Sequence, residues 1–317
     1  MYGPRRRICN TAATKVVGAF LCTVLKKEQG LGLDLDRDAV RVTNLEKSFQ
    51  VKTKEGKRAP GVIGGARGRV KSVSAVRGVS FEVPRREIFG ILGPNGSGKS
   101  TLIRILSTLV LHDEGDCEIF GLDVIRDSMT LRRHINRVSV DAAFFKKLSA
   151  WENLSYAARL YGIPVRDARQ RVTGILEEMG FGRDRIDEPL EHLSRGMQQK
   201  VAIARALFTS PVLLLMDEPT TGLDPVSKRQ VQDYTLSVRE QHDATVLLTT
   251  HDMDEAERVC DRVAIIHHGR FIAMGTIEEL KVQAGCLEGS LEDVFFEMTG
   301  KDLAHADLES EEEGEGT

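Results

Sequence analysis

The sequence predicts an α/β protein with a mostly parallel core sheet. One observation is a set of short, continuous apolar runs that are typical of buried strands. They lie at residues 88–92, 212–216, 245–249 and 263–266. The other is that amphipathic stretches, typical of helices, separate the later runs, at residues 226–240 and 254–260. Buried strands that alternate with helices indicate a parallel sheet covered on both faces.

An antiparallel β subdomain is predicted before the first of these strands. Residues 40–45 and 79–83 alternate between apolar and polar side chains, as paired strands at one edge of a sheet do. Residues 51–74, which lie between them, hold five glycines and seven basic residues against one acid. We expect a basic loop insertion here, either solvated or in contact with anionic lipid head groups.

A helical subdomain is predicted at about residues 146–190, where apolar residues recur at spacings of three and four. Residues 291–299 are expected to form a short closing helix. These elements divide the chain into an N-terminal extension (1–38), one main domain (39–300) and an acidic, disordered tail (301–317). The longest apolar stretch near the start, residues 16–25, is shorter than the roughly 20 residues that cross a bilayer.

A glycine-rich stretch between a predicted strand and a predicted helix indicates a nucleotide. It reads Gly93-Pro-Asn-Gly-Ser-Gly-Lys-Ser100 and fits the phosphate-loop pattern. Backbone N–H groups in such a loop converge on phosphates at a helix N-terminus. Lys99 would reach the β- and γ-phosphates, and Ser100 would bind Mg²⁺. The predicted ATP-binding residues are Gly93, Pro94, Asn95, Gly96, Ser97, Gly98, Lys99, Ser100 and Thr101.

Two carboxylates follow the buried strand at residues 212–216. Ligands of open α/β sheets bind at the carboxyl ends of the strands, where Asp217 and Glu218 are predicted to lie. We expect Asp217 to hold the same Mg²⁺ as Ser100, and Glu218 to polarise the attacking water.

A second anion site is predicted at Ser194, which can cap the helix that follows it. One nucleotide does not need two such sites in one chain. Either this is an ordinary capped helix, or it completes the nucleotide pocket of another copy.

The order of five motifs resembles the ATP-binding subunit of ATP-binding cassette (ABC) transporters over residues 40–300. The motifs are the phosphate loop, Leu193-Ser-Arg-Gly-Met, Leu213-Leu-Leu-Met-Asp-Glu-Pro-Thr220, Gly222-Leu-Asp-Pro225 and Thr250-His-Asp252. The resemblance implies the ABC ATPase fold of the P-loop NTPases and a head-to-tail dimer that sandwiches two ATP molecules.

The resemblance also implies the roles of individual residues. Ser194, Gly196 and Asp224 would act across the dimer interface, Glu218 would be the general base, and His251 would contact the γ-phosphate. Phe49, at the end of a predicted strand, matches the position of an aromatic residue that stacks on adenine.

Residues 81–90 and 291–300 are similar to the drug-export branch of this family, whose ATPase pairs with a separate transmembrane permease. The resemblance thus implies a peripheral protein at the cytoplasmic face of the membrane. We expect the permease to dock near residues 143–145 and 148–156, unless those aromatic residues only fill the chain's own core. The alternative is a soluble ABC-type ATPase acting on nucleic acid or ribosomes, which the basic N-terminal third would suit. No nucleic acid is expected as a partner, because such proteins usually carry two cassettes or a coiled coil.

The sequence departs from the family pattern in two segments. Val140, with Asp141 beside it, stands where the family usually has a glutamine that touches Mg²⁺. In the signature, Arg195 replaces a glycine and Met197 replaces a glutamine. The transported substrate is selected by the permease, so this sequence does not reveal it.

Overall fold

The computed structural model describes residues 34, 37–52, 70–139, 143–242 and 244–300. Most of the predicted N-terminal extension and of the basic insertion, and all of the acidic tail, lie outside these residues. Val140 and Asp141 do so as well.

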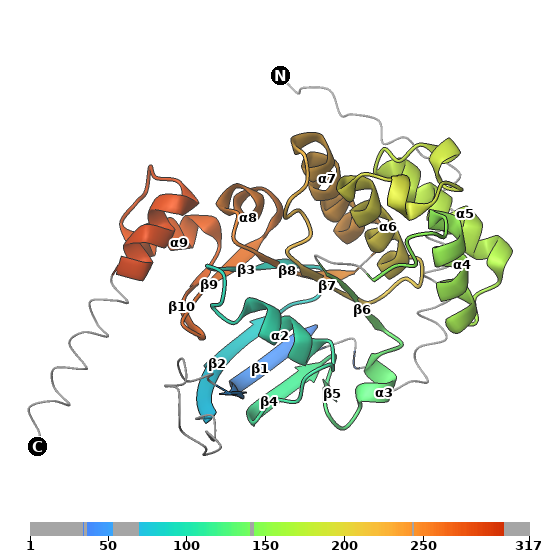
Figure 1. Cartoon of the computed structure of the whole chain (residues 1–317). Coiled ribbons are helices and arrows are strands. Elements are labelled where there is room, and N and C mark those ends of the chain that lie inside the picture. The colour runs from blue at the N-terminus through green and yellow to red at the C-terminus, as the bar shows by residue number, and fades with distance from the viewer. Residues whose placement is uncertain (1–33, 35–36, 53–69, 140–142, 243, 301–317) are drawn as a thin grey trace, which may run out of the picture.

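Two sheets form the framework of the protein (Figure 1). The smaller is antiparallel, in the order β2-β1-β4-β5, and the larger runs β10-β9-β3-β8-β7-β6. In the larger sheet only β10 is antiparallel to its neighbour, so the predicted fold class is confirmed. The strands are β1 (Val40–Lys52), β2 (Val70–Val83), β3 (Ile88–Leu92), β4 (Glu114–Ile119), β5 (Leu122–Asp123), β6 (Ile135–Val138), β7 (Leu213–Asp217), β8 (Thr245–Thr250), β9 (Arg262–His267) and β10 (Arg270–Gly275).

The first two strands are longer than predicted. β1 continues to Lys52 and β2 begins at Val70, so part of the expected loop at 51–74 is paired strand. Phe49 lies opposite Val73 in this extension, and Val51 lies opposite Lys71. The prediction was wrong about this boundary because backbone pairing continues through a stretch rich in polar and basic side chains.

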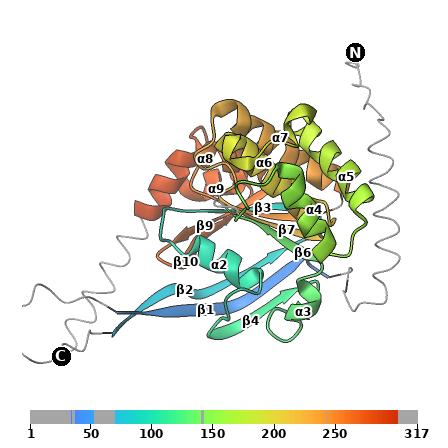
Figure 2. The same ribbon diagram turned by 45° about the vertical axis from the view of Figure 1, so that its right-hand side comes forward.

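Helices fill the space between the sheets and cover the outer face of the larger one (Figure 1). α2 lies between the two sheets, whereas α6, α7 and α8 lie on the opposite face of the larger sheet, as Figure 2 also shows. The helices are α2 (Lys99–Leu106), α3 (Ser128–Leu131), α4 (Ala150–Leu160), α5 (Val165–Glu178), α6 (Arg195–Leu207), α7 (Pro225–His242), α8 (Met253–Val259) and α9 (Ile277–Ala284). Short 3-10 turns occur at Arg183–Arg185 and Leu190–His192, and residues 291–300 are helical.

The apolar core explains why α2 sits where it does. One face of this short helix buries Leu102, Ile103, Ile105 and Leu106. These side chains belong to one cluster with residues of both sheets, including Val42 and Leu215. Burying each such side chain contributes about 1.5–3 kcal/mol, so the helix is held firmly against the sheets.

Register then brings three loops to one edge of the larger sheet. Leu92, the last residue of β3, pairs with Thr250, the last residue of β8. Asp217, at the end of β7, pairs with Thr249. Since these strands are parallel, the loops that follow them meet at their carboxyl ends, where ligands of such sheets bind. Within the described part of the chain, no helix is both long and apolar enough to cross a bilayer.

Candidate functional site

The glycine-rich loop joins β3 to α2, as predicted, and forms the wall of a pocket. Gly98 has φ 110°, and a Cβ there would lie 2.3 Å from the carbonyl oxygen of Ala75, so only glycine fits. No acidic residue occupies the first turn of α2, so nothing on this helix competes with an anion for its N-terminus. The pocket is lined by Ala75, Asn95, Gly96, Gly98, Lys99, Ser100, Thr101 and Glu218.

Lys99 holds a buried cation beside this pocket. Its ammonium donates hydrogen bonds to the carbonyl oxygens of Gly93 at 2.7 Å and Pro94 at 3.0 Å. It also lies 3.4 Å from Oε1 of Glu218. Burial lowers the pKa of Lys99, while the Glu218 carboxylate acts in the opposite direction. The ammonium is therefore held close to the position where a phosphate would meet the loop.

The two residues predicted to bind Mg²⁺ are in direct contact. Ser100 Oγ donates a hydrogen bond to Asp217 Oδ1 at 3.0 Å, and Thr249 Oγ1 donates to the same oxygen at 2.9 Å. Mg²⁺ prefers oxygen ligands and is usually held by one or two protein groups together with substrate phosphates. A hydroxyl and a carboxylate beside a phosphate loop fit that requirement. The described residues contain no cluster of three or more His, Cys, Asp or Glu side chains that could hold a metal by itself.

Glu218 has an unusual backbone conformation. Its φ is 49°, in the left-handed region that is uncommon for residues with a side chain, and its N–H donates to the Thr249 carbonyl at 3.0 Å. His251 Nδ1 lies 3.1 Å from Glu218 Oε2, and Thr221 Oγ1 donates to the same oxygen at 3.1 Å. Backbone strain of this kind is concentrated at active sites, because the surrounding structure must hold it in place.

Ser194, Gly196 and Asp224 form a second cluster. Ser194 caps α6, with the Met197 N–H donating to its Oγ at 3.3 Å. A Cβ on Gly196 would lie 2.4 Å from Ser227 Oγ and 3.3 Å from Asp224 Oδ2. Among the described residues, those that line the phosphate-loop pocket include none of these three. The structure therefore brings them together with one another and not with the loop of the same chain.

Two residues singled out in the sequence remain. Arg195 departs from the family signature, and Phe49 is predicted to stack on adenine. Arg195 lies over Gly222, where an added Cβ would be 3.0 Å from its guanidinium carbon. Phe49 lies on β1 and is 37% exposed, with the Lys47 ammonium 5.4 Å from the ring centroid. Its cross-strand partner Val73 is two residues from Ala75, a wall of the pocket. The ring is thus near the pocket and accessible.

Some residues near the site were missed by sequence reasoning. Arg137, on β6, lies 4.0 Å from Asp217 Oδ2, and Thr249 binds Asp217 directly. Glu255, on α8, accepts hydrogen bonds from Thr220 and Thr250. Arg137 and Glu255 resemble ordinary surface charges in the sequence. The sequence signals among these neighbours were the threonine pairs near the predicted hydrolytic residues, Thr220-Thr221 after Glu218 and Thr249-Thr250 before His251.

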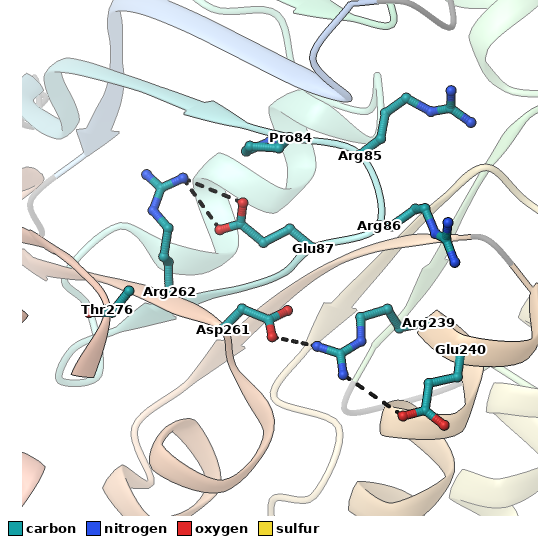
Figure 3. Close-up of a pocket in the computed structure, with 9 residues that line it drawn as sticks. All are labelled: Pro84, Arg85, Arg86, Glu87, Arg239, Glu240, Asp261, Arg262 and Thr276. Carbon is teal, nitrogen blue, oxygen red and sulfur yellow. Dashed lines mark hydrogen bonds and ion pairs between the residues drawn. The ribbon is translucent and has the colours of Figure 1, made fainter. Parts of the chain in front are cut away.

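A second pocket lies at the opposite, amino ends of β3 and β9 (Figure 3). All three of its acids are paired with arginines, Glu87 with Arg262, and both Asp261 and Glu240 with Arg239. Asp261 Oδ2 also accepts a hydrogen bond from the N–H of Ile88, the first residue of β3. These contacts fasten the strand ends together. Ligands of parallel sheets bind at the carboxyl ends, so we assign the site to the phosphate-loop pocket.

The likeness to known proteins extends across most of the described chain. Residues 76–221 match the family model described as ABC transporter. A daunorubicin/doxorubicin resistance ATP-binding protein of Streptomyces peucetius is 45% identical over 213 residues, which cover 67% of this chain and 63% of that protein. A daunorubicin resistance ATP-binding protein of Streptomyces coeruleorubidus is 37% identical over 239 residues, or 75% of this chain and 74% of that protein. The matched segment therefore spans less than two thirds of the first relative.

The fold is also similar to that of a solved structure. That structure is a dimeric ATP-binding cassette in a post-hydrolysis state with bound ADP and Pi, and it superposes with a TM-score of 0.64 at 25% identity. The superposition covers 75% of this chain and 98% of that chain.

Proposed function

Because this chain belongs to the ABC transporter family, we propose that it is the ATP-binding and ATP-hydrolysing subunit that powers a membrane export permease. The observation that carries the proposal is the meeting of four groups at one edge of the larger sheet. Lys99 and Ser100 from the phosphate loop lie in contact with Glu218 and Asp217 at the end of β7. Phosphate-binding and hydrolytic groups are thus within reach of one nucleotide.

In this proposal each residue has a separate task. The N–H groups of the loop and the Lys99 ammonium bind the phosphates, exchanging the Gly93 and Pro94 carbonyls for phosphate oxygens. Glu218 accepts a proton from the attacking water, and His251 keeps that carboxylate oriented from 3.1 Å away. Phe49 is proposed to stack on the adenine.

Mg²⁺ is proposed as the cofactor of hydrolysis, with Ser100 and Asp217 as the residues that would hold it. When bound, the ion neutralises charge that develops on the phosphate oxygens. Thr249 holds the Asp217 carboxylate in place by donating to Oδ1. Arg137, near the other carboxylate oxygen, orients the same side chain.

The proposal includes a head-to-tail dimer. Ser194, Gly196 and Asp224 are clustered with one another but do not line the pocket of their own chain. The helix N-terminus at Ser194 is suited to a phosphate. In a dimer it would face the γ-phosphate bound by the partner, and a paired ATPase subunit could replace a second identical copy.

A surface for the permease is proposed beside α4. Phe145 is 60% exposed, Tyr156 is 52% exposed, and their rings meet edge to face with centroids 5.9 Å apart. Leu160, one turn after Tyr156, is exposed as well. Phe144 differs, because it packs against the core beneath the Arg205 guanidinium, 4.5 Å from its ring centroid. Exposed aromatics on a helix edge suit a helix of a transmembrane subunit, which would put this chain at the cytoplasmic face of the membrane.

The experiment for this function measures ATP turnover by the full chain with and without Mg²⁺. We expect Mg²⁺-dependent release of phosphate by the wild type and none by Glu218→Gln, which keeps the shape of the side chain but cannot accept the proton. Glu218→Gln should still bind ATP and elute as a dimer in its presence. A wild-type chain that binds ATP without hydrolysing it, or turnover retained by Glu218→Gln, would contradict the proposal. The named drugs of the relatives, daunorubicin and doxorubicin, are the first substrates to test once a permease is paired with this chain.

A further inference from the structure

Glu255 is a buried carboxylate that joins the two segments on which the hydrolytic residues lie. Only 2% of it is exposed. Its Oε1 accepts a hydrogen bond from Thr220 Oγ1 at 2.8 Å, and its Oε2 accepts one from Thr250 Oγ1 at 2.7 Å. Thr220 follows Glu218 by two residues, and Thr250 immediately precedes His251. One carboxylate therefore links both segments through its two oxygens.

The surroundings of this carboxylate are unfavourable for a charge. Burial raises the pKa of Glu255, and the two threonine hydroxyls act in the opposite direction. No ion pair to Glu255 exists within the described ranges, and Lys228, the cation that influences it, binds Asp252 instead. A charge that is buried against hydroxyls alone is costly, so its hydrogen bonds are the reason the position is tolerated.

Further hydrogen bonds and an ion pair connect Thr250 to the loop that carries Asp224. Asp252 caps α8 by accepting from the Glu255 N–H at 2.9 Å, and its own N–H donates to Thr250 Oγ1 at 3.0 Å. The other Asp252 oxygen pairs with Lys228 of α7. The Lys228 N–H in turn donates to the Asp224 carbonyl at 2.9 Å. Thr250 is thus held by Glu255 on one side and by Asp252 on the other.

We propose that Glu255 is a positioning residue for ATP hydrolysis, which holds Thr220 against Thr250 and so fixes the Glu218 carboxylate beside the His251 imidazole. The proposal rests on the function proposed above. Glu255 does not line the phosphate-loop pocket, so it acts through the two threonines. The strained backbone of Glu218 needs such support from its neighbours, because φ of 49° is not its preferred conformation.

The test separates the effect of the threonine hydroxyl groups from the effect of side-chain volume. Thr220→Val and Thr250→Val keep the shape of the side chain but remove the donor, whereas Thr220→Ser and Thr250→Ser keep the donor. We expect kcat to fall between about tenfold and about a hundredfold in the valine variants and in Glu255→Gln, since small misplacements of reacting groups have effects of this size. The dissociation constant for ATP should change by less than about twofold, because the phosphate loop is untouched. The serine variants should recover most of the rate.

A matched control lies on the same helix. Glu257 is exposed and pairs with Lys281, so Glu257→Gln makes the same chemical change without touching the threonines. It should hydrolyse ATP at the wild-type rate.

The outcomes distinguish the two proposals. Valine variants that match the wild-type kcat would overturn the role of Glu255, as would equal losses in the valine and serine variants, which would point to packing. If the loss of kcat were accompanied by losses of ATP affinity and thermal stability, the role of Glu255 would be purely structural. If Glu255→Gln does not fold, the threonine series decides alone. A wild-type chain with no ATP turnover would contradict the proposed function instead.

Discussion

His251 Nδ1 lies 3.1 Å from Glu218 Oε2, so the imidazole at the end of β8 reaches the carboxylate at the end of β7. The neighbouring strands are in parallel register, with Asp217 opposite Thr249, and that register brings the ends of the two strands together. We expect His251→Ala to lower kcat by about 10²- to 10³-fold, because a positioned partner of the hydrolytic carboxylate is lost. Steady-state phosphate release measures this, with ATP affinity determined separately.

The control for that substitution is His268→Asn. His268 is exposed, follows β9 and does not line the phosphate-loop pocket. Asparagine tolerates its φ of 46°, so the control should keep the wild-type rate. A His251→Ala protein with full turnover would show that Glu218 needs no support from the imidazole.

Asp217→Asn should separate magnesium binding from nucleotide binding. The carboxylate touches Ser100 and Thr249, and asparagine keeps its size while removing the charge that favours a cation. The Mg²⁺ concentration for half-maximal turnover should rise roughly ten- to hundredfold. Titration of turnover with Mg²⁺ measures this, and Asp233→Asn on the exposed side of α7 serves as the control. An unchanged titration would remove Asp217 from the metal site.

Gly98→Ala should destabilise the chain as well as weaken nucleotide binding. The new Cβ would meet the Ala75 carbonyl oxygen at 2.3 Å on a backbone with φ 110°. We expect the free energy of unfolding to fall by about 2–4 kcal/mol, because the backbone at residue 98 would be strained and β2, which carries Ala75, would be displaced. Gly174→Ala should change the free energy of unfolding in the opposite direction, because an added Cβ would have nothing within 4 Å and the residue lies inside α5. It should raise the free energy of unfolding by about 0.5–1 kcal/mol. Urea denaturation of the two variants compares them.

Asp113 gives the stability of the smaller sheet a dependence on pH. Lys47 and the Ser48 N–H both donate to this carboxylate, and these contacts lower the pKa of Asp113. A folded pKa below the unfolded value means that the stabilisation is complete above about pH 4 and is lost as the pH falls through the folded value. Because the Asp113 side chain is 44% exposed, Asp113→Asn should cost about 0.5 kcal/mol at neutral pH and less at about pH 3. Asp116→Asn, on the strand β4 that begins just after Asp113 and without an ion pair among the described residues, is the control. A loss of equal size at both pH values would mean that charge is not the cause.

The fold was predictable where burial dominates the sequence. β3 and residues 213–216 of β7 are continuous apolar runs, and every residue in the two strands is buried. β6 and β10 were not predicted, because each lies at an edge of the larger sheet and keeps polar or half-exposed side chains such as Asn136 and Arg270. β10 pairs with the preceding strand β9, whereas the pairing of β6 depends on β7, a neighbour that is distant in sequence. A local pattern carries no record of that neighbour.

The candidate site was predictable from motifs but its supporting contacts were not. Lys99, Ser100, Asp217 and Glu218 lie together as their positions at strand ends suggested. Glu255 was missed, because a carboxylate in an acidic helix start looks exposed until the tertiary structure shows that α8 turns it inward. Buried polar residues are specified by their partners across the fold, and those partners come from different segments.

Phe145→Asp tests whether the surface beside α4 docks a membrane subunit. Phe145 stands 60% exposed against Tyr156, so a carboxylate there costs little in folding but opposes an apolar partner helix. We expect unchanged turnover by the isolated chain and at least about a tenfold loss of co-sedimentation with membranes that contain the permease. Phe144→Asp is the contrasting variant, because that ring packs against the core under Arg205 and its replacement should lower thermal stability. Wild-type membrane binding by Phe145→Asp would place the docking surface elsewhere on the chain.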